Sequence, residues 1–246
     1  MKKLLLLPLA AALAALSCST SSAAVIASDN AANYSGSWSV GSNGGTGFGV
    51  WAFASAGTSF SGRYIGATGQ GSTSFGLYAD NTGGSIYTAD RPFTGGALAI
   101  GQTFSIDLGH TAFVSAGGNI GINFLAGSTP VFTVKSVYAG TDWQLNDGGS
   151  DFGTGQASTD NTSYHFTFTV NSAHSYSYTL GAAFATINTA VNDMTTITGV
   201  RLFDSLQGPG MNAGYNNLAI TVPEPTTIGL LLGGAGLLAF VRRCRS

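Results

Sequence analysis

Ten aspartates supply the carboxylates between residues 25 and 222, and Glu224, the single glutamate of the chain, follows them. Hydrolysis of a glycosidic bond needs two carboxylates that face each other across the sugar. Such a pair would have to come from aspartates such as Asp80, Asp90, Asp107, Asp142 and Asp204. Most of these stand beside glycine, asparagine or other turn residues, where aspartate is ordinarily a turn former. No Gly-x-Ser-x-Gly occurs either, so we predict that the protein is not an enzyme.

Cysteine and histidine give no metal or thiol signature. Cys18 and Cys244 lie in the terminal segments, which excludes thiol catalysis and cysteine-bound zinc in the region between them. His110, His165 and His174 have no ligand-like spacing. We expect the last two to be exposed to solvent, one on the polar face of a strand and one in a turn. No cofactor is predicted.

Two glycine-rich segments are candidates for ion or phosphate binding. Residues 146–151, Asn-Asp-Gly-Gly-Ser-Asp, place several oxygen donors in one loop that could hold Ca²⁺. This loop lacks the spacing and the closing glutamate of an EF-hand, so a turn is the favoured interpretation. Residues 45–49, Gly-Thr-Gly-Phe-Gly, have neither dinucleotide spacing nor a Lys-Ser/Thr ending, and are not a phosphate loop.

Aromatic side chains offer a possible sugar-stacking surface. Trp143, which is followed by Gln144 and has aspartate and asparagine nearby, is the first candidate for a glycan contact among the three tryptophans. Aromatic residues of a β-sandwich more often belong to the core, so exposure decides between the two interpretations. Pairs such as Thr167 with Thr169 and Thr196 with Thr198 also form short Thr-x-Thr ladders. Without a repeat they favour ordinary strand propensity over ice binding.

The charge balance excludes nucleic-acid binding. The formal charge of the whole chain is −2, but four basic residues oppose ten aspartates between residues 25 and 222, which gives −6 for that region. Binding to phosphates requires clustered lysine and arginine, and the four basic residues are scattered: Arg63, Arg91, Lys135 and Arg201.

Period-two alternation predicts the strands that must position these residues. It is clearest from Tyr164 to Val170, and turn residues 171–174 lead into a return strand over residues 175–180, which predicts a hairpin. Further strands are predicted around Phe104–Leu108, Ile120–Phe124, Val131–Tyr138 and Ile197–Phe203, with a last strand over residues 216–222.

This pattern predicts one all-β domain over residues 25–222, an antiparallel β-sandwich or jelly roll. Many short strands are separated by glycine, asparagine and aspartate, and no convincing amphipathic helix precedes the C-terminal segment. A β-solenoid is the alternative, but the sequence has no repeat of fixed period.

The first 24 residues have the pattern of a signal peptide. Lys2 and Lys3 precede an apolar run from residue 4 to residue 16, and small residues lead to a predicted cleavage site after Ala24. A short membrane helix is the alternative, although the run is short for a full span. Lipidation of Cys18 is a second alternative, since residues 15–18 loosely resemble a lipobox.

The C-terminal residues 223–246 have three parts. Pro223, Glu224 and Pro225 precede an uncharged stretch, residues 226–241. Its length is below the roughly 20 residues of a comfortable transmembrane helix, so flanking side chains must snorkel or the bilayer must thin. The chain then ends with three arginines that the positive-inside rule holds in the cytoplasm: Arg242, Arg243 and Arg245.

This C-terminal segment closely resembles the PEP-CTERM sorting signal of Gram-negative bacteria. The resemblance implies that Pro223, Glu224 and Pro225 are the processing site of an exosortase, an integral-membrane cysteine protease or transpeptidase that commonly occurs with exopolysaccharide production. The alternative is an ordinary C-terminal anchor with a proline-rich stalk. The segment is also classed under an ice-binding protein C-terminal label, which describes the tail and does not predict ice binding.

Together these features predict an exported, non-catalytic protein of the cell envelope, the cell surface or the extracellular matrix. Its predicted partners are signal peptidase, exosortase, the inner membrane as a transient anchor, and extracellular polysaccharide. The alternative function is a glycan-binding module, with a glycoside-active enzyme or an ice-binding protein less favoured.

Overall fold

The computed structural model describes residues 23–57, 60–80, 84–112, 117–206 and 212–223. The chain divides into two compact units, of which one spans Val25–Thr221 and the other consists of the two terminal segments. Nearly all of the second unit lies outside the described residues. The predicted signal peptide and the predicted transmembrane helix fall there, and the fold below is that of the first unit and its boundary residues.

The described residues form strands joined by turns and two short 3₁₀ helices, η1 (Ala31–Asn33) and η2 (Met194–Thr196). The strands are β1 (Ala24–Asp29), β2 (Ala52–Ala56), β3 (Ser61–Ala67), β4 (Thr73–Ala79), β5 (Ile86–Pro92), β6 (Thr103–His110), β7 (Asn119–Ala126), β8 (Thr129–Val137), β9 (Asp142–Asn146), β10 (Phe152–Ala157), β11 (Tyr164–Ser172), β12 (Ser175–Leu180), β13 (Ala183–Ile187), β14 (Gly199–Ser205) and β15 (Ala213–Val222).

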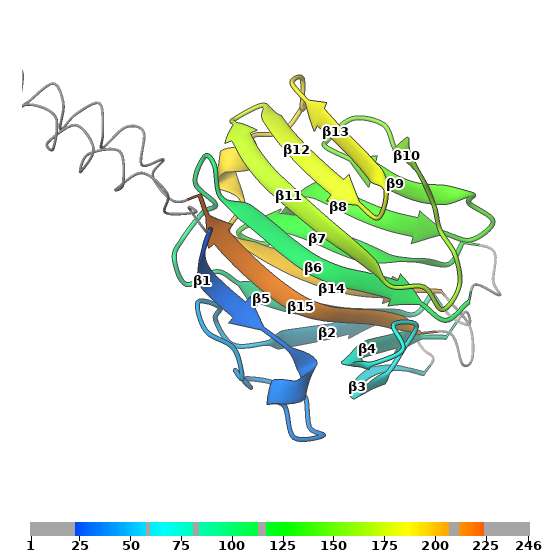
Figure 1. The fold of residues 1–246 in the computed structure, drawn as a ribbon. Coiled ribbons are helices and arrows are strands. Elements are labelled where there is room, and N and C mark those ends of the chain that lie inside the picture. The colour runs from blue at the N-terminus through cyan, green and yellow to red at the C-terminus, as the bar shows by residue number, and fades with distance from the viewer. Residues whose placement is uncertain (1–22, 58–59, 81–83, 113–116, 207–211, 224–246) are drawn as a thin grey trace, which may run out of the picture. The chain divides into compact units, whose positions relative to one another are not determined.

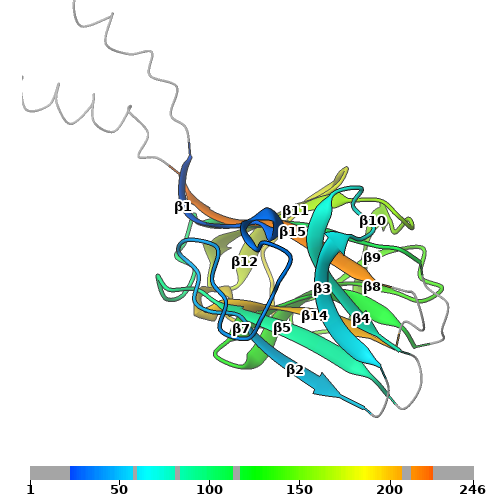
Figure 2. The same ribbon diagram turned by 90° about the horizontal axis from the view of Figure 1, so that it is seen from below.

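Two sheets face each other (Figures 1 and 2). The first sheet has the order β13-β12-β11-β6-β15-β4-β3, and β1 also pairs with β15. The second sheet has the order β10-β9-β8-β7-β14-β5-β2. Neighbouring strands such as β11 and β12, or β14 and β7, run antiparallel. The predicted all-β sandwich is therefore confirmed.

Alternating side chains create the core between the sheets. On β11, Phe166 and Phe168 are fully buried while His165 on the opposite face is exposed, because successive side chains of a strand point to opposite faces. Phe168 lies 4.8 Å from Phe124 of the second sheet, measured between ring centroids. Phe132 contacts both Phe168 and Tyr176. These aromatic contacts connect the two sheets at the centre of the sandwich.

Candidate functional site

The last strand runs directly into the Pro-Glu-Pro motif. β15 lies between β6 and β4, and its backbone pairs with β6 as far as Thr221, opposite Thr103. Pro223, the residue after the strand, is exposed. The predicted final strand is thus confirmed and no linker separates it from Pro223. Glu224, Pro225 and the rest of the tail, including Arg242, Arg243 and Arg245, lie outside the described residues.

The start of β1 lies beside the end of β15. Just after β1, the Asn30 side chain donates to Asn217 Oδ1, and the Ala31 backbone N–H donates to Asn216 Oδ1 at 2.9 Å. Asn216 and Asn217 belong to the first half of β15, so β1 runs along that strand in the opposite direction. The chain therefore enters and leaves the sandwich at one end (Figure 1).

A buried ion pair fixes the N-terminal segment to the second sheet. Arg91 of β5 donates from Nη2 to Asp29 Oδ2 and to Asn43 Oδ1, both at 2.7 Å. The Tyr34 hydroxyl donates to Asp29 at 2.7 Å and accepts from Trp51 Nε1 at 2.9 Å. Burial, assisted by the hydrogen bond to Asp29, raises the pKa of Tyr34 to about 12. These contacts serve structure, because the ion pair has no exposed surface.

Trp143 is not a glycan contact. Its side chain has no exposed surface and packs edge-to-face against Tyr164, with ring centroids 5.7 Å apart. Trp38 and Trp51 are buried as well. Trp143 lies on the inward face of β9, and a buried indole cannot stack on a sugar. The expectation of a tryptophan platform is therefore wrong for this chain.

The candidate aspartates are distributed over different surfaces. Asp90 forms two hydrogen bonds of 2.7 Å with Arg201 on the outer face of the second sheet. Asp107, on the outer face of the first sheet, lies 2.6 Å from His165 Nδ1. Asp204 is fully buried between the sheets. These three carboxylates therefore do not face a common cleft.

The loop over residues 146–151 is a turn held by its own side chains. Asn146 accepts from the Gly148 N–H at 2.9 Å and donates to Asp151 at 2.8 Å. Lys135 donates to Asp151 at 2.6 Å, which holds the pKa of that carboxyl below its usual range. Asp147 is buried and accepts from the Tyr176 hydroxyl. Within the described ranges, no three histidine, cysteine or acidic side chains gather as a metal site.

His165 on β11 and His174 in the turn before β12 are both exposed, as the sequence predicts. His110 is buried instead, and its Nε2 lies 2.8 Å from Ser158 Oγ. Burial lowers the pKa of His110 to about 4, so this imidazole is neutral at neutral pH.

Polar side chains cross the outer face of the second sheet in a row that sequence reasoning missed. The polar row contains one residue from each of five neighbouring strands, in the order Asp90, Arg201, Asn123, Thr133 and Asn146. All five are half-buried. Thr133 donates to Asn123 at 2.7 Å, and Arg201 is held by Asp90, which raises the pKa of Arg201. The row presents carboxylate, guanidinium, amide and hydroxyl groups, each of which can form a hydrogen bond with a hydroxyl group.

The outer face of the first sheet carries hydroxyl groups that bond to one another. Thr103 pairs with Thr169 and Thr167 with Thr179, both at 2.7 Å. The predicted Thr167–Thr169 ladder is therefore present on a strand. Thr196 belongs to η2 and not to a strand, so Thr196 and Thr198 do not form the second expected ladder.

The last 26 residues of the chain, 221–246, match the family model of the PEP-CTERM protein-sorting motif. The match starts at Thr221, inside β15. No curated protein matches the sequence. Among the described residues, no helix has the length and apolar character of a membrane span.

Solved structures show a similar fold at low sequence identity. A sialidase matches with a TM-score of 0.50 and 9% identity over 70% of this chain and 17% of its own. The globular domain of T. cruzi calreticulin matches with a TM-score of 0.48 and 10% identity, over 77% of this chain and 90% of its own. A Caenorhabditis elegans galectin matches with a TM-score of 0.39 and 16% identity, over 59% of this chain and 94% of its own. The chain spans about a sixth of the sialidase, and that likeness concerns the fold alone.

The fold and the tail together define a class, an antiparallel β-sandwich that carries a C-terminal sorting signal. That signal is a PEP-CTERM protein-sorting motif. It implies export, processing by an exosortase and delivery toward the cell surface.

Proposed function

We propose that the protein is a non-catalytic component of the cell surface or extracellular matrix, made as a precursor with two removable ends. Signal peptidase removes residues 1–24, and residues 226–241 then hold the domain at the inner membrane with Arg242, Arg243 and Arg245 on the cytoplasmic side. Exosortase acts at Pro223, Glu224 and Pro225. The sandwich is thereby transferred to its final location.

The observation that carries this proposal is the junction between the sandwich and the sorting motif. The family match begins at Thr221, where the backbone still pairs with Thr103 of β6. The processing motif thus begins at the folded surface, and cleavage there would release the sandwich with almost no trailing peptide.

Intact-mass measurement tests the processing step. Protein is recovered from the envelope and from the medium of the native host, for the natural sequence and for a variant with Pro223→Ala, Glu224→Ala and Pro225→Ala. We expect a product that ends near residue 223 for the natural sequence and its loss in the variant. A full-length tail in both proteins would instead indicate a permanent membrane anchor.

The polar row favours a second function, weak binding of extracellular polysaccharide on the outer face of the second sheet. Arg201 and Asn123 lie opposite each other on adjacent strands. Hydrogen bonds restrain both side chains, since Arg201 donates to Asp90 and Asn123 accepts from Thr133. Fixed polar groups bind sugars at a lower entropic cost than mobile ones do. Here the polysaccharide made by the same cell is the proposed ligand.

Affinity electrophoresis in gels that contain the host polysaccharide tests this second function. We expect Asn123→Ala and Arg201→Gln to reduce retardation several-fold. Thr167→Val on the opposite sheet face is the matched control and should leave it unchanged, with thermal unfolding used to verify that all variants fold. Equal retardation of all proteins would remove the polar row from consideration.

A further inference from the structure

The end of the sandwich at which the chain enters and leaves exposes aliphatic side chains. Val25 and Ile26 at the start of β1 are 62% and 47% exposed, and Ile100 is 65% exposed. Three segments at this end, residues 25–28, 93–102 and 219–223, contain no charged side chain. The neighbouring segment over residues 193–198, whose Ile197 carbonyl accepts from the Leu98 N–H, adds one acid, Asp193. Contiguous exposed apolar surface on a soluble domain commonly marks an interaction site.

Ile100 is held at the tip of a defined turn. The Gln102 N–H donates to the Ala99 carbonyl at 3.0 Å, and Gln102 Oε1 accepts from the Ala99 N–H at 2.9 Å. Gly101 has a φ of +86°, the left-handed conformation that this turn position requires. The Gly101 N–H also donates to the Val170 carbonyl at 2.8 Å. The exposure of Ile100 is therefore built into the fold.

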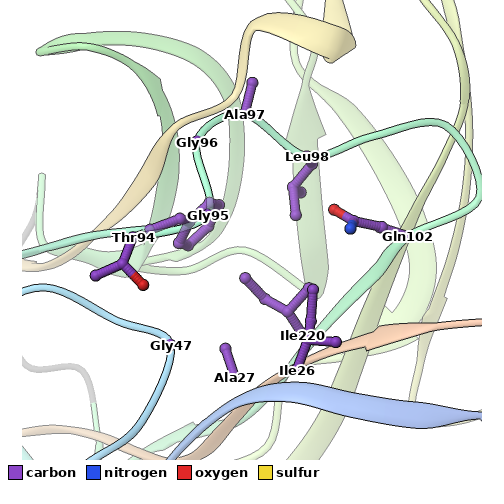
Figure 3. A pocket seen from close by; sticks show the side chains of 11 residues that line it. Ile26, Ala27, Gly47, Thr94, Gly95, Gly96, Ala97, Leu98, Gln102 and Ile220 are labelled. Atoms are coloured by element: carbon purple, nitrogen blue, oxygen red, sulfur yellow. The ribbon is translucent and has the colours of Figure 1, made fainter.

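An apolar groove of about 180 Å³ opens beside these residues, between β1, β15 and residues 93–102 (Figure 3). Ile26, Phe93, Leu98 and Ile220 supply most of its apolar lining. Gly47, Gly95 and Gly96 form part of its wall. Its polar side chains are Thr94 and Gln102, and none of its side chains is ionic, so a hydrocarbon occupant would meet no charge in the groove.

The length of the tether determines what lies next to this end. Only three residues separate Val222, the end of β15, from Thr226, where the uncharged stretch begins. Even fully extended, that span reaches about 14 Å. The headgroup layer on one side of a bilayer is itself about 5–8 Å thick. The tether therefore keeps this end of the sandwich within about 9 Å of the membrane surface, close enough for exposed side chains to reach it.

We infer that this end of the sandwich docks on the lipid bilayer in the anchored precursor. Val25, Ile26 and Ile100 then lie in the interfacial region, and the groove opens toward the acyl chains. Side chains of this type enter the interface favourably because burial of apolar area is favourable. The inference rests on the proposed function, since it requires insertion of residues 226–241.

Site-directed fluorescence quenching on the full-length, signal-processed protein tests the inference. In a Cys244→Ser background, single cysteines are introduced by Ile100→Cys, by Val25→Cys or by Phe60→Cys and labelled with bimane. The proteins are reconstituted in vesicles of phosphatidylethanolamine and phosphatidylglycerol that contain headgroup spin-labelled lipid. Phe60 is the matched control because it is 83% exposed and lies next to Asp80, near the opposite end of β15.

We expect quenching at positions 25 and 100 to exceed that at position 60 several-fold. Equally weak quenching at all three positions, in protein that floats with the vesicles, would overturn the inference and leave the anchor intact. Failure of every variant to float would instead contradict membrane insertion of the tail, and with it the proposed function.

Discussion

Arg91 and Asp29 form an ion pair of 2.7 Å in which neither side chain has exposed surface. The two residues come from β5 and from the end of β1, and Asp29 lies close behind the predicted cleavage site at Ala24. The guanidinium also lies 4.8 Å from the Trp51 ring. Desolvation lowers the pKa of Arg91, and the charge of Asp29 opposes this shift. The first strand of the exported domain is thus attached through a charge pair that water does not reach.

Replacement of one partner should therefore destabilise the domain strongly. We expect Arg91→Met to lower the free energy of unfolding by about 3–5 kcal/mol, because it leaves the Asp29 carboxylate buried without its counter-charge. Urea unfolding followed by circular dichroism measures the change. Arg201→Met, which breaks the half-exposed pair with Asp90, is the control and should cost about 1 kcal/mol or less. Equal losses in the two variants would contradict the assignment.

Asp204 should make the domain less stable as the pH rises. It is fully buried, its Oδ2 accepts from the Ala213 N–H at 3.0 Å, and its Oδ1 has no partner among the described residues. Burial raises the pKa of Asp204 well above 3.8. As the pH rises, Asp204 loses its proton at a lower pH in the unfolded chain than in the folded domain. The stabilisation that is present below about pH 4 is therefore lost progressively as the pH rises above 4.

The Asp204→Asn variant tests this prediction, since it copies the protonated carboxyl in shape. We expect the variant to match the natural protein near pH 4 and to be more stable at pH 7 to 8, as measured by denaturant unfolding at a series of pH values. A constant difference across that range would show that Asp204 does not titrate on unfolding.

His110 should produce the opposite trend in acid. Burial lowers the pKa of His110 from 6.5 to about 4. Between these two pH values His110 is protonated in the unfolded chain but neutral in the folded domain. Stability is then lost as the pH falls from about 6.5 toward 4, by at most about 1.4 kcal/mol per pH unit. We expect His110→Gln to flatten this slope. Denaturant unfolding at pH values between 4 and 7 measures the slope, and an unchanged slope in this variant would contradict the assignment.

Trp143→Ala should act on stability and not on ligand binding. Removal of a fully buried indole leaves a cavity, and we expect a loss of about 3–5 kcal/mol in urea unfolding. Gln144→Ala, the next residue on the opposite face of β9, should change stability by about 0.5 kcal/mol or less. Loss of polysaccharide retardation by folded Trp143→Ala protein at low temperature would contradict the structural role.

Local alternation predicted much of the second half of the fold. Tyr164–Val170 and its return strand form the β11–β12 hairpin with Phe168 opposite Tyr178, because an aromatic residue at every second position leaves one face to bury. The alternation did not predict β1 to β5, β9, β10 or β13. On β4, Gly76 interrupts the apolar pattern because the ring of Tyr64 packs against its backbone, where a Cβ would lie 2.5 Å from Tyr64 Cζ.

The error at Trp143 and the missed polar row have a common cause. The polar neighbours Asp142 and Gln144 suggested a glycan contact, yet residues next to each other on a strand point to opposite faces. Their polarity indicates that Trp143 faces inward. The polar row arises from strand order and register across five strands, and the Arg91–Asp29 pair from contacts between distant segments. Local pattern determines neither.

The pairing of β1 with β15 also has a consequence for protein engineering. Val25 and Thr221 lie at the same end of the sandwich, so the chain behaves as an insertable cassette whose two ends are neighbours. The sandwich could replace a surface loop in an unrelated host protein without stretching the host backbone. Conversely, new termini could be opened at an exposed turn such as the β11–β12 hairpin, once a short peptide joins the original ends.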